Sequence, residues 1–205
     1  MKTVTALFLS LFAVAALVPG PPPMAQQSAP LSVKPVVEKK LARLPAGPLF
    51  WRIETFPTLA DAQAAAQGAN GATSLAAEIS GKAWLFTLGP SGGATPGATR
   101  VAEVGPVPPV QAPEYLLRIN HASGPPGART APHSHPGSEA FYVLKGRLGQ
   151  KTPHGTVHAD AGTAMNGHGA DMPMVVFNAG TTDLDQLVMF VVDATRPFST
   201  PARFE

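Results

Sequence analysis

Two histidines and a glutamate with a spacing suited to metal binding lie between Gly127 and Gly146. His133 and His135 are two residues apart, so on a β-strand both imidazoles leave the same face. Residues 136–138, Pro-Gly-Ser, predict a turn, and a hairpin there would return the Glu139 carboxylate beside the imidazoles. Two neutral imidazoles and a carboxylate can hold a divalent transition metal and leave positions open for water or substrate.

The same alternation predicts which side chains surround this set. It points Arg129 inward before the histidines, and it points Phe141 and Val143 inward after the glutamate. Val176, on a later strand, belongs to the same inward apolar set. Arg129 either meets an anionic substrate at the mouth or lies exposed on the rim. The sequence therefore predicts a mostly apolar pocket with a metal near one mouth, since converging ionisable groups are costly to bury without a cation between them.

The composition excludes several classes of protein. Only 14% of the 205 residues are charged, and the chain contains 20 glycines and 23 prolines. This profile argues against a coiled coil, a helical repeat array or a charged disordered tail. The 15 Lys and Arg residues form no cluster, so we expect no nucleic-acid partner. Without cysteine, the chain has no disulfide, no thiolate metal site and no thiol nucleophile.

The N-terminus has the pattern of a secretory signal peptide. A positive start at Lys2 precedes an apolar core at residues 4–18, and a Pro-Gly-rich break follows at residues 19–23. The core is shorter than the roughly 20 apolar residues that a membrane-spanning helix needs, and no later stretch reaches that length. We predict a signal peptide at residues 1–25, cleaved after Ala25, and a periplasmic or secreted mature chain with no membrane span.

The rest of the chain reads as strands separated by Gly and Pro turns. Residues 26–47 have no period and predict a flexible lead-in to a single domain over residues 48–205. A strand is expected at 48–56, a short helix between a Thr58 cap and a Gly68 stop, and a hairpin of 73–79 and 83–88. Further strands are expected at 99–104, 114–120, 139–144, 156–160, 172–178 and 187–192, with a loop-like end at 194–205 lying across the surface.

These short strands indicate an all-β sandwich or barrel. The N-terminal strands carry Trp51 and Trp84, which are expected to pack against it.

The residues around the histidines carry a family resemblance. The order Gly127, five residues, His133-x-His135, three residues, Glu139, six residues, Gly146 resembles the first signature motif of the cupin superfamily at every fixed position. The resemblance covers residues 115–192. It implies a double-stranded β-helix, or jelly-roll, barrel with an N-terminal extension of strands and one helix, and it implies a homodimer. By the same resemblance, His133, His135 and Glu139 are metal ligands.

The second cupin motif is only partly present. Asn178 fits the pattern, but Met174 occupies the position at which the resemblance calls for a histidine. Three interpretations remain open. Met174 packs as an apolar wall and the metal keeps three protein ligands plus water, or the Met174 thioether binds a soft ion such as Cu(I), or His168 bends in from its Gly-flanked loop and ligates.

The resemblance implies a range of functions, because cupins include dioxygenases, sugar isomerases and epimerases, decarboxylases and non-catalytic binding or storage proteins. The apolar inward set favours an aromatic or weakly polar small-molecule ligand over a sugar. We therefore expect an exported metal-dependent oxygenase-like enzyme acting on a small organic molecule. The alternatives are an isomerase-like cupin, a non-catalytic periplasmic binder of a metal or small ligand, and an interaction scaffold. The donor set suits Fe, Mn, Co, Ni, Cu and Zn alike.

Overall fold

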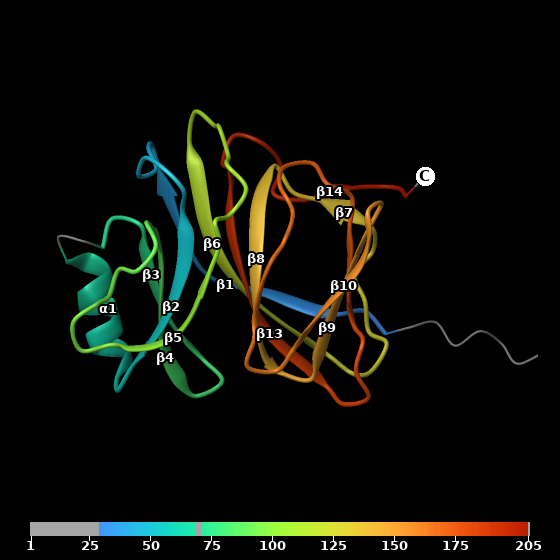
Figure 1. The fold of residues 1–205 in the computed structure, drawn as a ribbon, viewed down its shortest axis with the longest axis horizontal. Helices are drawn as coiled ribbons and strands as arrows, with labels where there is room; N and C mark the ends of the chain where they lie inside the picture. The colour runs from blue at the N-terminus through green and yellow to red at the C-terminus, as the bar shows by residue number, and fades with distance from the viewer. Residues whose placement is uncertain (1–28, 69–70, 205) are drawn as a thin grey trace, which may run out of the picture.

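The computed structural model describes residues 29–68 and 71–204. Its strands form layers that run from left to right in Figure 1, with the one helix at the left edge. A four-stranded sheet and the helix form the N-terminal layer, a five-stranded sheet lies in the middle, and smaller sheets of three and two strands lie on the far side. The all-β prediction, with a jelly-roll barrel and an N-terminal extension, is confirmed.

The N-terminal layer follows the local signals of the sequence closely. The Thr58 side chain caps the helix by accepting a hydrogen bond from the Asp61 amide, and the Gly68 amide closes its end. Ser80-Gly81 turn the predicted hairpin, with both residues at positive φ. The sheet has the order β3-β4-β2-β5. The elements are β2 (Phe50–Phe56), α1 (Leu59–Gln67), β3 (Ser74–Ile79), β4 (Lys82–Gly89) and β5 (Thr99–Val104).

The central sheet is antiparallel throughout and has the order β1-β6-β13-β8-β11. Its longest strands extend beyond the predicted ranges by a few residues. Gly137 brings β8 close to β13, because a Cβ atom there would lie 2.3 Å from the Val191 carbonyl oxygen. The strands are β1 (Ser32–Leu41), β6 (Tyr115–Gly124), β8 (Gly137–Lys145), β11 (Ala164–Asn166) and β13 (Leu184–Asp193).

Strand β1 corrects the expectation of a flexible lead-in over residues 26–47. Residues 32–41 pair with β6, from Ser32 opposite Ser123 to Leu41 opposite Tyr115. As an edge strand, β1 exposes much of its length, so it lacks the apolar alternation that marks half-buried strands. The proposed signal peptide at residues 1–25 and its cleavage after Ala25 lie outside the described residues. In the described part of the chain, no helix has the length and apolar character to cross a membrane.

The far layer contains the strands that the sequence predicted least well. Its three-stranded sheet has the order β10-β9-β12, and β14 pairs with β7 beside it. The predicted strand at 172–178 is regular only from Val175, while β9 and the two-residue strands were not expected. The strands are β7 (His133–Ser134), β9 (Arg147–Thr152), β10 (Gly155–Asp160), β12 (Val175–Asn178) and β14 (Thr200–Pro201).

Each face of the central sheet packs against an apolar core. Successive residues along β6, β8 and β13 therefore point alternately into one core and into the other. One face packs with Trp51 and Trp84 of the N-terminal layer, as expected for these residues. The other face closes the barrel with the far layer. The first core takes Leu117, Ile119, Ala140, Tyr142, Leu187, Met189 and Val191 from the sheet, and the second takes Ala122, Phe141, Val143, Val188, Phe190 and Val192.

Candidate functional site

A cavity of about 320 Å³ lies on the barrel side of the central sheet. It is hereafter called the barrel cavity. Aromatic and aliphatic side chains form most of its wall, and a few polar groups converge among them. It is lined by Leu31, Val33, Asn120, Ala122, Thr130, Ala131, His133, His135, Glu139, Phe141, Val176, Gln186, Val188, Phe190, Phe198 and Ser199.

The two histidines stand together at this cavity with the same tautomer. The His133 Nδ1 lies 2.8 Å from the Ala131 carbonyl oxygen, and the His135 Nδ1 lies 2.6 Å from that of Phe198. A carbonyl oxygen only accepts, so each Nδ1 carries a proton and each neutral ring keeps its free lone pair on Nε2. The ring centroids are 4.9 Å apart and the rings are nearly perpendicular. Both Nε2 atoms are therefore available to a ligand or metal.

Glu139 reaches the same cavity from the opposite wall. Strands β7 and β8 do not pair with each other, because β7 pairs with β14 while β8 lies in the central sheet between β13 and β11. The predicted hairpin is therefore wrong, since residues 135–136 carry the chain from one wall of the barrel to the other. The Glu139 carboxyl accepts a hydrogen bond of 2.5 Å from the Gln150 Nε2. Gly167 packs against its side chain so closely that a Cβ atom there would lie 2.4 Å from the Glu139 Cγ.

Burial favours the neutral forms of Glu139 and His135 in the barrel cavity. Glu139 is 2% exposed. Desolvation raises the pKa of its carboxyl to about 8, against the opposing effect of the Gln150 hydrogen bond. Desolvation also lowers the pKa of His135 to about 4, helped by the charges of His133 and Arg118 and opposed by the hydrogen bond to Phe198. Near pH 7 and without a cation, both groups are uncharged.

The donor atoms of these residues are of the types that bind a divalent metal, but the side chains are not grouped closely enough to form a site. The two Nδ1–H groups donate to carbonyl oxygens, as metal-ligating histidines commonly do, and Gln150 orients the carboxyl. Across residues 29–68 and 71–204, however, no three His, Cys, Asp or Glu side chains are grouped so that they could hold a metal ion. His133, His135 and Glu139 therefore line one cavity without forming the closely grouped ligand set that the sequence predicts.

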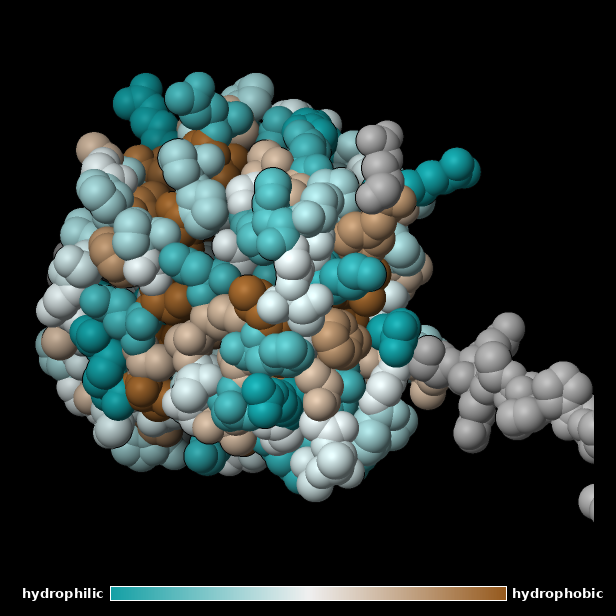
Figure 2. Space-filling view, turned by 45° about the vertical axis from the view of Figure 1, so that its right-hand side comes forward, coloured by the Kyte–Doolittle hydropathy of each residue, from teal (hydrophilic) through white to brown (hydrophobic). Residues whose placement is uncertain are grey.

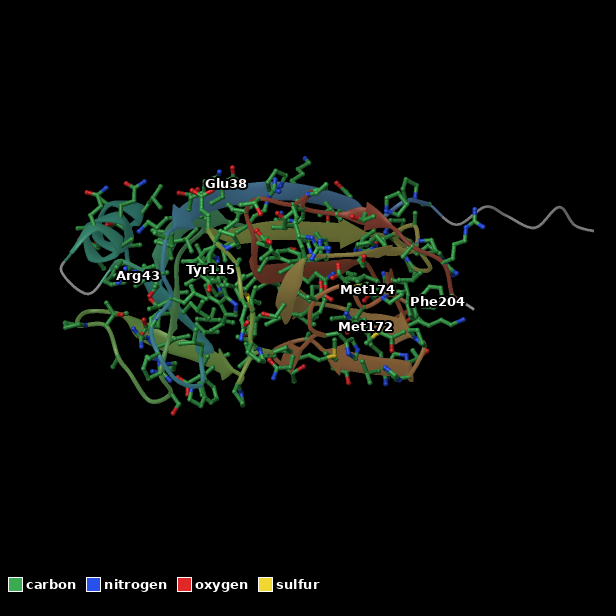
Figure 3. The ribbon with its side chains drawn as sticks, turned by 90° about the horizontal axis from the view of Figure 1, so that it is seen from above. Glu38, Arg43, Tyr115, Met172, Met174 and Phe204 are labelled. Atoms are coloured by element: carbon green, nitrogen blue, oxygen red, sulfur yellow. The ribbon has the colours of Figure 1, made fainter. Side chains whose placement is uncertain are left out.

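Neither of the two candidates for a fourth ligand is among the residues that line the barrel cavity. Met174 is 1% exposed, pairs through its backbone with His133, and accepts a hydrogen bond on its sulfur from Gln150 at 3.5 Å. It lies with Met172 in the barrel half of the molecule, far from Arg43 and Tyr115 (Figure 3). His168 follows β11, and partial burial together with neighbouring His154 lowers its pKa. The arrangement of Met174 is that of a packed apolar residue.

The predicted pocket residues divide in two. Phe141 and Val176 line the barrel cavity, and Val143 is buried in the apolar core beyond it. Arg129 is exposed, and its Nε donates to the Gly127 carbonyl oxygen at 3.4 Å. The expected alternation fails there because the regular part of β7 begins only at His133, and the adjacent residues 130 and 131 both line the cavity.

Several polar and aromatic residues of the site were not predicted, among them Asn120, Gln186, Gln150 and Phe198. Gln186 is a single amide just before the apolar run from Leu187 to Val192, and this polar interruption was a usable signal; Asn120 is less marked, because Arg118 precedes it by two residues on β6. Gln150 lies on β9, which was not predicted. Phe198 comes from the C-terminal segment, where its ring lies 4.7 Å from that of His135, and no local pattern marks it.

Comparisons with known proteins find similarity to solved structures. A scan against protein-family models finds no match, and a search of curated proteins finds none. Solved structures with a similar barrel include a cupin-like protein of Thermotoga maritima, at 17% identity, 42% coverage of this chain, 64% coverage of that chain and a TM-score of 0.38.

Two further similar structures are named as enzymes. The structure of the DMSP lyases RdDddP and RnDddQII shows 20% identity over 42% of this chain and 44% of that one, with a TM-score of 0.36. The polyketide cyclase RemF of Streptomyces resistomycificus shows 22% identity over 43% and 62%, with a TM-score of 0.35. This chain thus spans less than two thirds of the length of each of the three. Similarities this low concern the barrel fold and say nothing of activity.

The two pKa shifts predict how the stability of the metal-free protein varies with pH. Because folding raises the pKa of Glu139, the folded state keeps a proton that the unfolded state loses, and stability falls as the pH rises toward about 8. The lowered pKa of His135 acts in the opposite sense, but only below its ordinary value of 6.5. Of these two groups, only Glu139 contributes to the pH dependence between pH 6.5 and 8. The melting temperature should therefore fall as the pH rises over that range.

Glu139→Gln removes the titrating group while keeping its shape, so it should flatten this dependence between pH 6.5 and 8. The measurement is differential scanning calorimetry in the presence of a chelator. Glu78→Gln, at an exposed position of β3, serves as the matched control and should keep the wild-type slope. Identical slopes for Glu139→Gln and wild type would show that Glu139 does not hold its proton in the folded state.

Proposed function

We propose that this chain binds a small, neutral and mostly apolar organic molecule in the barrel cavity. The observation that carries the proposal is the character of the cavity wall, where aromatic and aliphatic side chains surround a few polar groups, and burial favours the neutral forms of two of these, His135 and Glu139. A cavity of about 320 Å³ has room for a molecule built on one ring. Burial of its apolar surface would supply most of the favourable free energy of binding.

The aromatic groups at the cavity support a ring-bearing ligand. The rings of Phe190 and Phe198 meet edge to face with centroids 5.0 Å apart, and the imidazole of His135 lies within 5 Å of both. Such a wall offers both ring edges and ring faces to an aromatic guest. A sugar would instead need many inward hydrogen-bonding groups, and the wall is predominantly apolar.

A metal-dependent, oxygenase-like activity is the second candidate. Its specific support is the tautomer shared by His133 and His135, which leaves both Nε2 lone pairs free beside the cavity that Glu139 also lines. These three residues would hold a divalent ion, and the cation would favour the ionised form of the Glu139 carboxyl. Such an ion supplies Lewis-acid or dioxygen chemistry to a bound molecule. The candidate ranks second because, among the described residues, no three His, Cys, Asp or Glu side chains are grouped closely enough to hold an ion.

Export and assembly complete the proposal. The pattern of residues 1–25 supports export to the periplasm or the medium, and the cupin resemblance alone supports a homodimer. An interaction scaffold has less support. Apolar residues are interspersed with hydrophilic ones over the face seen in Figure 2, and the large apolar side chains exposed in the described part are Val33, Val36 and Val157.

Toluene is the simplest probe of the proposed function. We expect wild-type protein to bind it in a titration followed by calorimetry or by methyl NMR shifts. Ala122→Leu extends a side chain of the cavity wall into the space and should weaken binding by about tenfold or more. Circular dichroism would establish that the variant is folded.

A second cavity provides the matched control for this titration. It measures about 630 Å³, and its lining includes five prolines and Val110. Val110→Leu should leave toluene binding unchanged. Binding that is lost in Val110→Leu but kept in Ala122→Leu would place the ligand in that second cavity and contradict the proposal.

The second candidate is tested by elemental analysis of protein loaded with Fe, Mn, Cu, Ni or Zn and then dialysed. Wild type should retain close to one ion per chain, and His133→Ala should retain almost none. His158→Ala, at an exposed position of β10, is the control and should match wild type. Met174→Leu should also keep the ion, because the thioether packs in the apolar core. Equal, near-zero stoichiometry in wild type and His133→Ala would reject the metal site.

A further inference from the structure

Two buried amides lie on the cavity face of the central sheet without hydrogen-bond partners. Asn120 on β6 is 4% exposed and Gln186 on β13 is fully buried, and both line the barrel cavity. Among the described residues, no group pairs with the Asn120 Oδ1, the Gln186 Oε1 or the Gln186 Nε2. Buried amides are normally hydrogen-bonded, so three unpaired atoms at one place call for an explanation.

The strand register places these amides side by side in apolar surroundings. Asn120 lies opposite Val188 and Gln186 lies opposite Ala122, so the two amides are diagonal neighbours on one face. Across the next strand junction, Gln186 lies opposite Val143. Apart from each other, the amides face only apolar residues across the strands, although Arg118 lies two residues before Asn120 on β6.

A buried amide elsewhere in the barrel shows the usual arrangement. Asn178 donates to the carbonyl oxygens of Gly124 and Thr182 and accepts from the Gly180 amide. The Asn178 side chain thus links the backbone at Gly124, Gly180 and Thr182, so its role is structural. Asn120 and Gln186 form no such links through the three unpaired atoms. An unpaired buried amide lowers the free energy of unfolding, whereas a leucine at the same position would not.

We infer that Asn120 and Gln186 recognise the polar end of the ligand, and that this end is a neutral carboxamide or lactam on a ring. The inference rests on the proposed function of the barrel cavity. A carboxamide presents a carbonyl acceptor and an N–H donor in one plane, which matches the Nε2 donor and Oε1 acceptor of Gln186. The Asn120 Oδ1 accepts a further N–H. The apolar ring then lies against the rest of the wall.

The charges around the cavity favour a neutral end over a carboxylate. No lysine or arginine side chain is among the residues that line the cavity. A carboxylate has acceptors only, so it would leave the Gln186 Oε1 facing another oxygen, and Arg118, which lies over the Phe198 ring, is already paired with Glu38. A carboxamide satisfies donor and acceptor together.

Titrations of the metal-free protein with benzamide, benzoate and toluene test the inference. Wild type should bind benzamide more tightly than either other compound. Gln186→Leu, a change to an apolar side chain of similar size, should weaken benzamide binding about tenfold, as expected for the loss of paired hydrogen bonds, and should weaken it more than it weakens toluene binding. Unchanged benzamide affinity in Gln186→Leu would overturn the inference while the proposed function stands. Loss of toluene binding by wild type would overturn the proposed function itself.

Thermal stability without ligand provides the second readout. Gln186→Leu should keep or raise the melting temperature, because it removes an unpaired buried amide. Asn178→Leu is the matched control and should lower the melting temperature, because it removes three hydrogen bonds. A melting temperature lowered as much by Gln186→Leu as by Asn178→Leu would show that the amide serves the fold and would overturn the inference.

Discussion

The central sheet of this protein is covered on both faces, and the site depends on that constraint. Its inward and outward residues must alternate, because one face closes the core of the N-terminal layer and the other closes the barrel. Ile119 and Asn120 are adjacent on β6 and therefore point to opposite faces of the sheet. Ile119 packs in an apolar core, whereas Asn120 lines the cavity. A slip of one residue would exchange the two faces, so the register that stabilises the fold also delivers the polar groups to the barrel cavity.

Desolvation in that cavity determines what its polar groups can do. It holds the carboxyl of Glu139 and the imidazole of His135 uncharged near neutral pH, which suits a neutral guest. The C-terminal segment fixes the tautomer of His135, because the Phe198 carbonyl oxygen accepts a hydrogen bond from its Nδ1 and the Phe198 ring packs against the imidazole, although that hydrogen bond opposes the lowering of the His135 pKa. The Arg118 guanidinium, on β6, lies 4.3 Å from the centroid of the Phe198 ring. This cation–π contact helps to hold the C-terminal segment in place.

Local patterns in the sequence predicted what local forces determine. Thr58 and Gly68 bound the helix as capping predicts, and His133 and His135 reach one cavity as strand alternation predicts. Features that depend on pairing between distant segments were missed. Strand β1 has no apolar alternation and is stabilised by β6, while Phe198 reaches His135 from 63 residues away. Glu139 reaches the cavity from the opposite wall because β8 pairs with β13 rather than with β7, and no local signal reports that choice.

Strand alternation directs the proposed ligand-binding groups of the central sheet to its barrel face. Neighbouring residues of β13 provide the direct measurement, because Val188 lines the cavity while Leu187 and Met189 belong to the other core. We predict intermolecular NOEs from bound toluene to the methyl groups of Val188 and Val176, and none to Leu187 or Met189. NOEs to Leu187 and Met189 without any to Val188 would contradict the account.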